Sequence, residues 1–377
     1  FFFKQKTAYE IMPSLGGSGM CIRDRHYFTS REKIIFELGN LTASIFTYDT
    51  GVRALKLENR MGYLIGLPFK GQQIWELHFN ERQLGMKSMF KQPKNVDFFL
   101  NTYGCFFMHC GAWRMGCPGP EDNHPLHGEL PLAPYDSAGI IFGEDENGRF
   151  IGMTGSYNYS LAFSVHYTAI PTVKLYEDMT LVEISIHIQN RSGYPMELMY
   201  MAHVNFRPVT NGKILQTLKW DSNHMVLRKS VPAHIKVSDK FKDLLNRLEV
   251  DPGISKILRE EDEYNPEVAF FMTNPDTDKE GWAHFLQVHP DGSSDYIKYK
   301  PAEFDHATRW ITRTKDQEAL GLALPATCDP EGYTAEQKKG NIKLIEAGGK
   351  KSFTLFAGYL SKKDTEKVIE KLGDILV

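Results

Sequence analysis

The sequence lacks a long apolar run: nowhere do its 377 residues supply the roughly 18 consecutive apolar residues that a membrane-spanning helix needs. It also lacks an excess of charge of either sign, since 44 Lys and Arg stand against 47 Asp and Glu and leave a formal net charge of −3. Such a chain has no general electrostatic attraction to nucleic acid or to an anionic membrane. We therefore expect a soluble protein that binds neither nucleic acid nor membranes.

Cysteine is scarce, and the few cysteines lack the regular spacing of a disulfide framework. Setting aside Cys21, which belongs to the terminal segment discussed next, they are Cys105, Cys110, Cys117 and Cys328. A chain of this length can bury a hydrophobic core without disulfides. We therefore predict reduced thiols and a cytoplasmic location.

Residues 1–25 lack the pattern of a folded domain. They contain the peptides KQKTAYEI and MCIRDR, which resemble the translation of sequencing-adapter read-through. A signal peptide is not indicated, because Lys, Gln and Glu interrupt any apolar core. We expect this segment, with Cys21, to lie outside the fold and a single domain to span residues 26–377.

The remaining chain lacks the alternation of strands with long helices that a doubly wound fold requires. Short apolar runs of strand length, broken by Gly, Asn or Asp, fill residues 33–79. Asn147-Gly148 predicts a tight hairpin turn between two further runs. Residues 181–189 alternate apolar and polar side chains as a half-buried strand does. Further strands are predicted over residues 196–206, 268–272, 284–288, 296–299 and 353–359.

Helical spacing of apolar residues is limited to two regions. One is residues 240–263, interrupted at Asp251-Pro252-Gly253, and the other is residues 362–372. The predicted fold is therefore all-β, a large antiparallel sandwich with a small helical insertion and a C-terminal helix.

Residues 101–135 form the most unusual stretch. They combine three histidines, three cysteines and a tryptophan with many glycines and prolines, and most of the stretch has neither helical nor strand period. This composition is typical of a loop that carries a functional site. Six potential metal ligands lie between residues 105 and 127, but no close Cys-x2-Cys pair is present. We expect no metal, although so many Cys and His side chains leave zinc as an alternative. These potential ligands are Cys105, His109, Cys110, Cys117, His124 and His127.

Two histidines stand out as candidate functional residues. His203 lies on a predicted apolar strand, and Asn205, two residues on, shares its face, which suggests a polar cavity. The alternative is an ordinary core histidine. His127 precedes Gly128, which permits close approach of a ligand to the backbone, and its alternative is an ordinary surface loop. Trp113 and Arg114 nearby would suit a sugar, whose C–H groups an aromatic face covers.

These two fragments carry a family resemblance. NHPLHG, at residues 123–128, resembles the HLHG-type loop of galactose mutarotases (aldose 1-epimerases), and AHVNF, at residues 202–206, resembles their second histidine motif. An uncharacterised branch of that superfamily is more similar still, because it has a Cys-Gly segment before the LHG motif, as Cys110-Gly111 stands here. The order and spacing of the motifs fit over most of residues 33–360.

The resemblance implies a galactose mutarotase-like β-supersandwich with a sugar-binding cleft on one concave sheet. It also implies cofactor-free ring opening and closure of a sugar by a general acid and a general base. His203 matches the position of the acid, and His127 matches a histidine that holds the substrate and assists catalysis. The remaining candidates for substrate contact are Asn205, His109, Trp113, Arg114, His124, Arg207 and Trp310.

One position departs from the family pattern. The family has its catalytic glutamate late in the chain, and the matching position here is Leu324. Losing a general base should cost about a hundred- to ten-thousandfold in rate. Glu129, two residues from His127, is the first candidate for a replacement base, and Asp305 is the second. The alternative for each is an ordinary solvated carboxylate.

The sequence therefore predicts a carbohydrate-active protein, an aldose 1-epimerase-like isomerase that interconverts the anomers of a free sugar without a cofactor. Two alternatives stay open. The loss of the glutamate at Leu324 suggests a non-catalytic sugar-binding or sensor protein. An epimerase or isomerase of a keto or acidic sugar would need its base in a different position.

Overall fold

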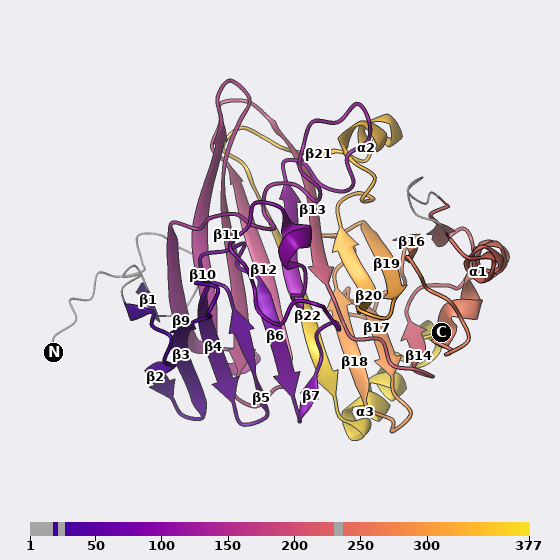
Figure 1. The fold of residues 1–377 in the computed structure, drawn as a ribbon, viewed down its shortest axis with the longest axis horizontal. Coiled ribbons are helices and arrows are strands. Elements are labelled where there is room, and N and C mark those ends of the chain that lie inside the picture. Colours follow the sequence, from indigo (N-terminus) through magenta and orange to yellow (C-terminus); the bar gives the residue numbers. More distant parts are fainter. Residues whose placement is uncertain (1–17, 22–26, 230–236) are drawn as a thin grey trace.

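The computed structural model describes residues 18–21, 27–229 and 237–377, and they form two large antiparallel β-sheets with a few peripheral helices (Figure 1). The nine-stranded sheet has the order β1 (Ser18–Cys21), β9 (Ser137–Asp145), β10 (Gly148–Leu161), β11 (Val165–Tyr176), β12 (Leu181–Asn190), β22 (Lys350–Leu360), β18 (Ser294–Tyr299), β17 (Ala283–Val288) and β14 (Lys213–Gln216).

The thirteen-stranded sheet carries the candidate site. Its order is β15 (Met225–Leu227), β16 (Val268–Thr273), β19 (His306–Arg313), β20 (Glu318–Ala326), β13 (Met196–Val204), β8 (Phe107–Ala112), β6 (Ile74–Phe79), β5 (Gly62–Gly66), β4 (Arg53–Asn59), β3 (Leu41–Thr47) and β2 (Lys33–Leu38). Two short strands pair off this path, β21 (Lys343–Ile345) with β13 and β7 (Arg82–Gln83) with β6.

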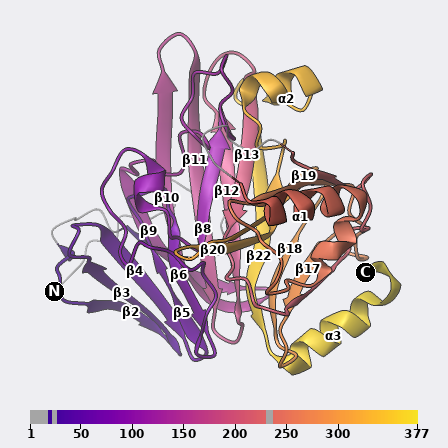
Figure 2. The same ribbon diagram turned by 45° about the vertical axis from the view of Figure 1, so that its right-hand side comes forward.

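The helices are short and lie at the edges of the sheets (Figures 1 and 2). They are α1 (Asp239–Val250), α2 (Tyr333–Lys339) and α3 (Lys362–Leu372), with 3₁₀ turns η3 (Phe99–Thr102), η4 (Pro252–Lys256) and η5 (Gly373–Ile375). No helix in the described part of the chain is long and apolar enough to cross a membrane. The predicted all-β class and the predicted C-terminal helix are confirmed, whereas the cytoplasmic location stays a prediction.

The alternating pattern over residues 181–189 is confirmed as β12. Val182, Ile184, Ile186 and Ile188 are buried in the space between the two sheets, and the residues between them are partly exposed. The predicted hairpin is confirmed as well, because β9 ends at Asp145 and β10 begins at Gly148, whose φ of 107° suits glycine.

Two local predictions are wrong. Residues 107–112, predicted as loop, form β8, whose six residues are all buried between the neighbouring strands β13 and β6. A strand covered on both faces shows no alternation of apolar and polar residues, so its period is hidden. The second is the helical prediction for the residues after η4, up to residue 263. No helix continues there, because the backbone of Leu258 bonds to Asn211 and Gly212 instead.

The terminal segment 1–25 falls mostly outside the described residues. Its residues 18–21, which we expected to lie outside the fold, pair as β1 with residues 139–142 of β9 and extend the nine-stranded sheet by one edge strand. The backbone groups of an edge strand accept a partner of almost any sequence, since the ladder uses only main-chain atoms. The adapter origin of this segment stays a prediction.

Apolar side chains form two separate clusters on the two faces of the thirteen-stranded sheet. The larger cluster fills the space between the sheets and includes residues of both. The smaller one lies on the opposite face, where residues such as Met108, Met199, Met201 and Leu324 are covered by loops that contribute Phe99 and Met115. This second face carries the candidate site.

An ion pair with a buried carboxylate joins the two sheets. Asp295 of β18 is fully buried, and Arg82 of β7 donates two hydrogen bonds to its carboxylate, at 3.0 and 2.8 Å. Gln287 of β17 donates a third, at 2.6 Å. A buried carboxylate is stable only while such donors compensate for its lost hydration.

We therefore predict that Arg82→Met lowers the free energy of unfolding by about 3 kcal/mol, because it leaves the Asp295 charge without its cation. The control is Arg60→Met, whose partner Asp178 is exposed and whose loss should change the same quantity by less than about 0.5 kcal/mol. Urea denaturation measures both. Equal losses in the two variants would contradict the assignment of a structural role to the buried pair.

Candidate functional site

The alternation of side chains along β13 separates two environments. Tyr200, Ala202 and Val204 point into the core between the sheets, whereas Met201 belongs to the cluster on the opposite face. His203 alternates with Ala202 and Val204, so it shares the face of Met201. It is 4% exposed. The sequence thus directs a single imidazole from the middle of the large sheet toward the covering loops.

The loop with His127 is held by backbone contacts to β8. The Gly111 N–H donates to the His127 carbonyl at 3.0 Å, and the Leu130 N–H donates to the Gly111 carbonyl at 2.8 Å. Gly128 has a φ of +83°, and a Cβ there would lie 1.9 Å from the Arg114 carbonyl oxygen. The two glycine-containing motifs therefore pack directly on each other, which explains why both need glycine.

His127 itself has a φ of 60°, in the left-handed region that a side chain other than glycine rarely adopts. Its N–H donates to the Gly116 carbonyl at 2.9 Å, so the loop holds this conformation from both sides of the residue. Backbone strain of this kind persists only where the surroundings enforce it, and it is enriched at functional sites.

The two histidines, although 76 positions apart, lie ring to ring. The ring centroids of His127 and His203 are 5.5 Å apart. Aromatic rings surround them: Trp310 lies 5.5 Å from His203, Tyr103 lies 6.1 Å from His203, and Phe99 lies 5.5 Å from His127. Two imidazoles and three aromatic rings from four different segments therefore meet on one face of the sheet.

Both rings carry buried polar atoms without partners in the described part of the chain. Nδ1 of His127 and Nδ1 of His203 are buried and make no hydrogen bond. Thr308 pairs with Leu324 across β19 and β20, so it shares that residue's face of the sheet, and its hydroxyl is also buried and unbonded. Buried polar atoms are nearly always hydrogen-bonded in native proteins, so three such atoms on one face point to a polar ligand.

Burial sets the charge of both imidazoles. Loss of hydration lowers the pKa of His127 to about 4, and the nearby Arg228 charge adds to this effect. Burial, and then the charge of His127, holds the pKa of His203 well below its ordinary value. Both rings are therefore neutral near pH 7, and each has one N–H donor and one nitrogen acceptor.

Asn205 has a supporting position. Its side-chain oxygen accepts a hydrogen bond from the Tyr103 hydroxyl at 3.0 Å, and its amide donates to the Cys105 carbonyl at 3.0 Å. Asn205 is fully buried. Asn205 therefore acts through Tyr103: its side chain holds the Tyr103 hydroxyl, whose ring lies beside His203, and it also holds the backbone at Cys105.

Sequence reasoning missed two charged residues beside this cluster, Arg228 and Glu267. Trp310 Nε1 donates to Glu267 Oε2 at 2.7 Å, and Arg228 Nη1 donates to Glu267 Oε1 at 3.2 Å. The Glu267 charge contributes to raising the pKa of Tyr103, after the larger effect of burial and those of two cysteines. No motif marks either residue, and the pairing of β15, β16 and β19 brings Glu267 to Trp310 and Arg228 to Glu267.

Several predicted ligand contacts are directed elsewhere. His109 was expected to contact the substrate, but it lies on the inter-sheet side of β8, fully buried, with Nδ1 2.8 Å from the Tyr200 hydroxyl. The Trp113 ring is covered by the Arg114 guanidinium at 4.0 Å, and Arg114 is itself bound to Glu197 at 2.8 Å. Neither the tryptophan face nor the guanidinium is open as a sugar platform there.

The two carboxylates proposed as bases are also engaged away from the histidines. Glu129 Oε1 accepts from the Trp113 N–H at 2.8 Å and from the Tyr167 hydroxyl at 2.6 Å, which attaches it to β11 of the other sheet. Burial raises its pKa although these bonds oppose the change. Asp305 pairs with Lys343 and with His306, and these bonds outweigh burial and lower its pKa.

His124 and Arg207 lie at the margins. His124 donates from Nδ1 to the Pro125 carbonyl at 2.9 Å, and its buried Nε2 has no hydrogen-bond partner in the described structure. Arg207 donates to Gln83 at 3.3 Å, at the β7 end of the sheet. Of the predicted site residues, His127, His203 and Trp310 are brought together, with Asn205 behind them.

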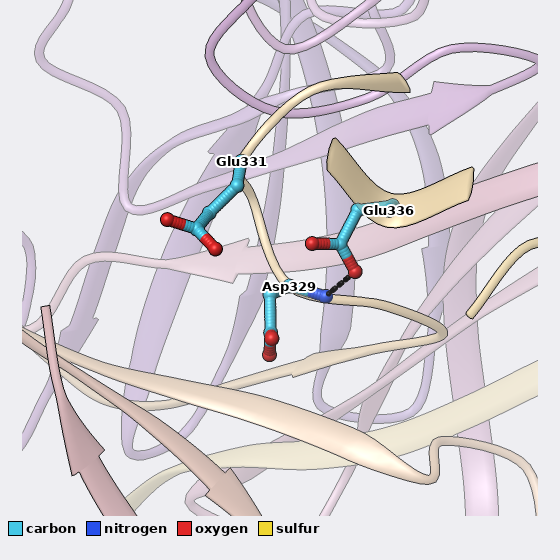
Figure 3. A group of neighbouring side chains, drawn as sticks. All are labelled: Asp329, Glu331 and Glu336. Atoms are coloured by element: carbon cyan, nitrogen blue, oxygen red, sulfur yellow. Dashed lines mark hydrogen bonds between the residues drawn. The ribbon is translucent and has the colours of Figure 1, made fainter. Parts of the chain in front are cut away.

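The cysteines and histidines of residues 105–127 do not converge on one point. Cys105 and Cys110 are packed among methionines, His109 lies on the opposite face, and the four cysteines whose side chains are described are free thiols. Among the described residues, the group of potential ligands whose atoms lie within 4.8 Å of one another is Asp329, Glu331 and Glu336, drawn in Figure 3.

A lysine already compensates for the charge of this acidic group. Lys339 Nζ lies 2.8 Å from Asp329, 2.6 Å from Glu331 and 2.9 Å from Glu336. Burial works to lower the pKa of Lys339, but the three carboxylates raise it above its ordinary value. The ammonium occupies the position that a cation would need. The group therefore fixes α2 to the loop after β20, and it does not indicate a metal centre.

Comparison with known proteins places these features in context. The family model described as a domain of unknown function, DUF4432, matches residues 49–357. No curated protein matches the chain. Among solved structures, a candidate aldose 1-epimerase from Klebsiella pneumoniae superposes with a TM-score of 0.75 at 14% identity, over 95% of this chain and 97% of that one.

Two further structures have the same fold. A galactose mutarotase-like protein from Clostridium acetobutylicum gives a TM-score of 0.56 at 11% identity, over 85% of this chain and 99% of that one. Another, from Lactobacillus casei, gives 0.51 at 13% identity, over 81% and 99%. The fold is therefore galactose mutarotase-like, as the sequence motifs predicted.

The buried histidines predict a pH dependence of stability. Burial lowers the pKa of His109 to about 3, so the unfolded chain, whose histidines titrate near pH 6.5, takes up protons before the folded protein does. The free energy of unfolding should therefore be greatest above pH 6.5 and fall as the pH drops toward 4, by up to about 1.4 kcal/mol per pH unit for each such histidine.

His109→Gln should flatten this slope between pH 6 and 4 by about 1.4 kcal/mol per pH unit, measured by urea denaturation. The exposed His166→Gln is the control for a histidine replacement and should change stability by less than about 0.5 kcal/mol. An unaltered slope in His109→Gln would contradict the prediction, because it would mean that the protonation of His109 does not differ between the folded and unfolded states over this pH range.

Proposed function

The chain belongs to the DUF4432 family, and we propose that this member binds a free sugar against His127, His203 and Trp310 and interconverts its anomers by acid–base catalysis. The observation that carries the proposal is the histidine pair: two neutral imidazoles in ring contact, each with a buried nitrogen that has no hydrogen-bond partner among the described residues. A polyhydroxylated ligand supplies many hydroxyl groups for such nitrogens, and its C–H faces suit the surrounding aromatic rings.

The proposed reaction needs only proton transfer. A base removes the proton from the anomeric hydroxyl, the bond between the anomeric carbon and the ring oxygen breaks, and an acid protonates that oxygen. After rotation of the open-chain carbonyl, the same steps in reverse close the ring on either face. Positioned side chains accelerate steps of this kind by about 10² to 10⁴ each. His203 is the proposed acid, and His127 holds and orients a hydroxyl.

The structural likeness supports the choice of ligand class. The similar structures from Klebsiella pneumoniae, Clostridium acetobutylicum and Lactobacillus casei are described as aldose 1-epimerase or galactose mutarotase-like proteins. At 11–14% identity this likeness concerns the fold, and function must be argued from the site. The site contributes the paired histidines and the tryptophan.

A non-catalytic sugar-binding protein is the second candidate, and one observation favours it. Leu324, where the family pattern has a carboxylate, is 2% exposed and packed among apolar side chains on the same face as His203. A binding protein would use the histidines as neutral hydrogen-bonding groups, the state that their low pKa values favour.

Polarimetry or NMR with a panel of pure aldose anomers tests the proposal. The wild-type protein should speed anomer exchange, and His203→Asn should reduce kcat by about 10² to 10⁴ while the protein still folds. His187→Gln is the matched control, because His187 lies on the outer side of β12 in the other sheet and should leave the rate unchanged. Saturable sugar binding without any exchange would instead identify the binding protein.

The pH profile gives an independent prediction. Because burial holds the pKa of His203 well below its ordinary value, its protonated form is a minor species at pH 7, and its fraction grows as the pH falls. If this form donates the proton, kcat/KM for the wild-type protein should rise as the pH is lowered from 8 to 5, by up to tenfold per unit. If kcat/KM instead decreases as the pH is lowered from 8 to 5, His203 acts as a base.

A further inference from the structure

We propose that Glu267 is the catalytic base of this site, which neither the family pattern nor the chain's own motifs indicate. The inference rests on the proposed function, because a base is needed only if the protein opens a sugar ring. It starts from a gap in that reaction: the proposed acid, His203, has no carboxylate beside it at the expected place, since Leu324 stands there.

The strand pairing brings Glu267 to the correct face. Ala269 of β16 lies opposite Trp310 of β19, so the two share a face of the sheet. Glu267 is two residues before Ala269 and therefore projects from the same face. The hydrogen bond from Trp310 Nε1 to Glu267 Oε2, at 2.7 Å, is the direct evidence of that orientation.

The Glu267 carboxylate is fixed but not saturated. Among the described residues each oxygen has one donor: Trp310 Nε1 for Oε2 and Arg228 Nη1, at 3.2 Å, for Oε1. A carboxylate oxygen has two acceptor sites, so each retains one for a substrate hydroxyl. The Glu267 side chain is 34% exposed, in contrast to the buried carboxylates that serve structural roles, such as Asp295 at 0%.

Two further contacts connect Glu267 with the histidine pair. Its anchor Trp310 lies against the His203 ring at 5.5 Å, and against the Tyr103 ring at 6.3 Å. Arg228, its other partner, is close enough to His127 for its charge to lower the pKa of that imidazole. Glu267 therefore belongs to the same cluster as His203, the proposed acid, and His127, which is proposed to hold a substrate hydroxyl.

The competing carboxylates lack these properties. Glu129 is bound by Tyr167 of the opposite sheet, and Asp305 is bound by Lys343 and His306. The described contacts join neither of them to His203, His127 or Trp310. A base must come within hydrogen-bond reach of the proton it removes, so position ranks ahead of pKa in this choice.

The proton transfers balance without a co-reactant. Glu267 takes the proton of the anomeric O–H as the carbonyl forms and the bond to the ring oxygen breaks, and that oxygen takes a proton from His203. Ring closure reverses both transfers: the ring hydroxyl gives its proton back to His203, and Glu267 gives its proton to the new anomeric oxygen, so both side chains return to their starting states. No oxidant, metal or second substrate is required.

The test is Glu267→Gln, which keeps the side chain's shape and removes its basicity. With the aldose that the wild-type protein converts fastest, we expect kcat to fall by about 10² to 10⁴ and KM to change less than about threefold. Glu177→Gln is the matched control, because Glu177 is also bound by an arginine, Arg149 at 3.1 Å, but lies in the turn directly after β11 of the nine-stranded sheet. It should leave kcat and KM unchanged.

Two more variants separate a chemical role from a structural one. Glu267→Asp should restore part of the lost rate, and Trp310→Phe, which keeps an aromatic ring but removes the Nε1 donor to Glu267, should lower kcat about tenfold. Thermal unfolding and calorimetric titration with the same sugar establish that each variant is folded and binds.

The outcomes distinguish the two hypotheses. Loss of rate in both His203→Asn and Glu267→Gln supports the assignment. If His203→Asn is inactive while Glu267→Gln keeps wild-type kcat, or if Glu267→Gln raises KM at unchanged kcat, the base assignment is overturned and the proposed function stands. If the wild-type protein exchanges no anomers of any sugar in the panel, both are overturned.

Discussion

The register of β13 in the thirteen-stranded sheet is the constraint on which the candidate site depends. In this register His203 lies opposite Met108 of β8, and Ala202 lies opposite His109. Because successive side chains point to opposite faces, a slip by one residue would turn His203 into the hydrocarbon between the sheets and bring Ala202 to the site. The apolar residues that alternate with His203 prevent this slip, since exposing Tyr200 or Val204 would lose their burial.

The covering loop supplies the second imidazole in an unfavourable conformation that hydrogen bonds of the surrounding backbone stabilise. His127 has a left-handed conformation and a buried ring nitrogen to which no described residue bonds, and both features are unfavourable. Hydrogen bonds from Gly111 and to Gly116 hold its carbonyl and its N–H. These bonds restrict the conformation of the loop, and a restricted loop would lose less conformational entropy on binding a ligand.

Much of this arrangement could be predicted from the sequence, and the failures have physical reasons. The alternation of β12, the hairpin at Gly148 and the pairing of His127 with His203 followed from period, turn chemistry and motif. The strand β8 was missed because a strand buried on both faces has no polar alternation, and without it the direction of His109 could not be assigned. The order of apolar and polar residues within a short segment does not show which face of a fully buried strand a side chain points to.

The charged residues of the site were missed for a different reason. Glu267 meets Trp310, and Arg228 meets Glu267, because three strands that are separate in the sequence pair side by side. In a sheet, adjacent strands lie about 4.8 Å apart, so a carboxylate two strands from the family's expected position is displaced by about 10 Å. Leu324 is on β20, and Glu267 immediately precedes β16, which is two strands away. A base so displaced can act only if the substrate is displaced with it.

The contacts of Trp310 indicate how the substrate would shift. Its ring lies between the two groups, against the His203 ring at 5.5 Å and bonded through Nε1 to Glu267. A sugar ring stacked on Trp310 would therefore lie next to both groups. The proposed base therefore depends on Trp310, whose ring contacts His203 and whose Nε1 holds the Glu267 carboxylate.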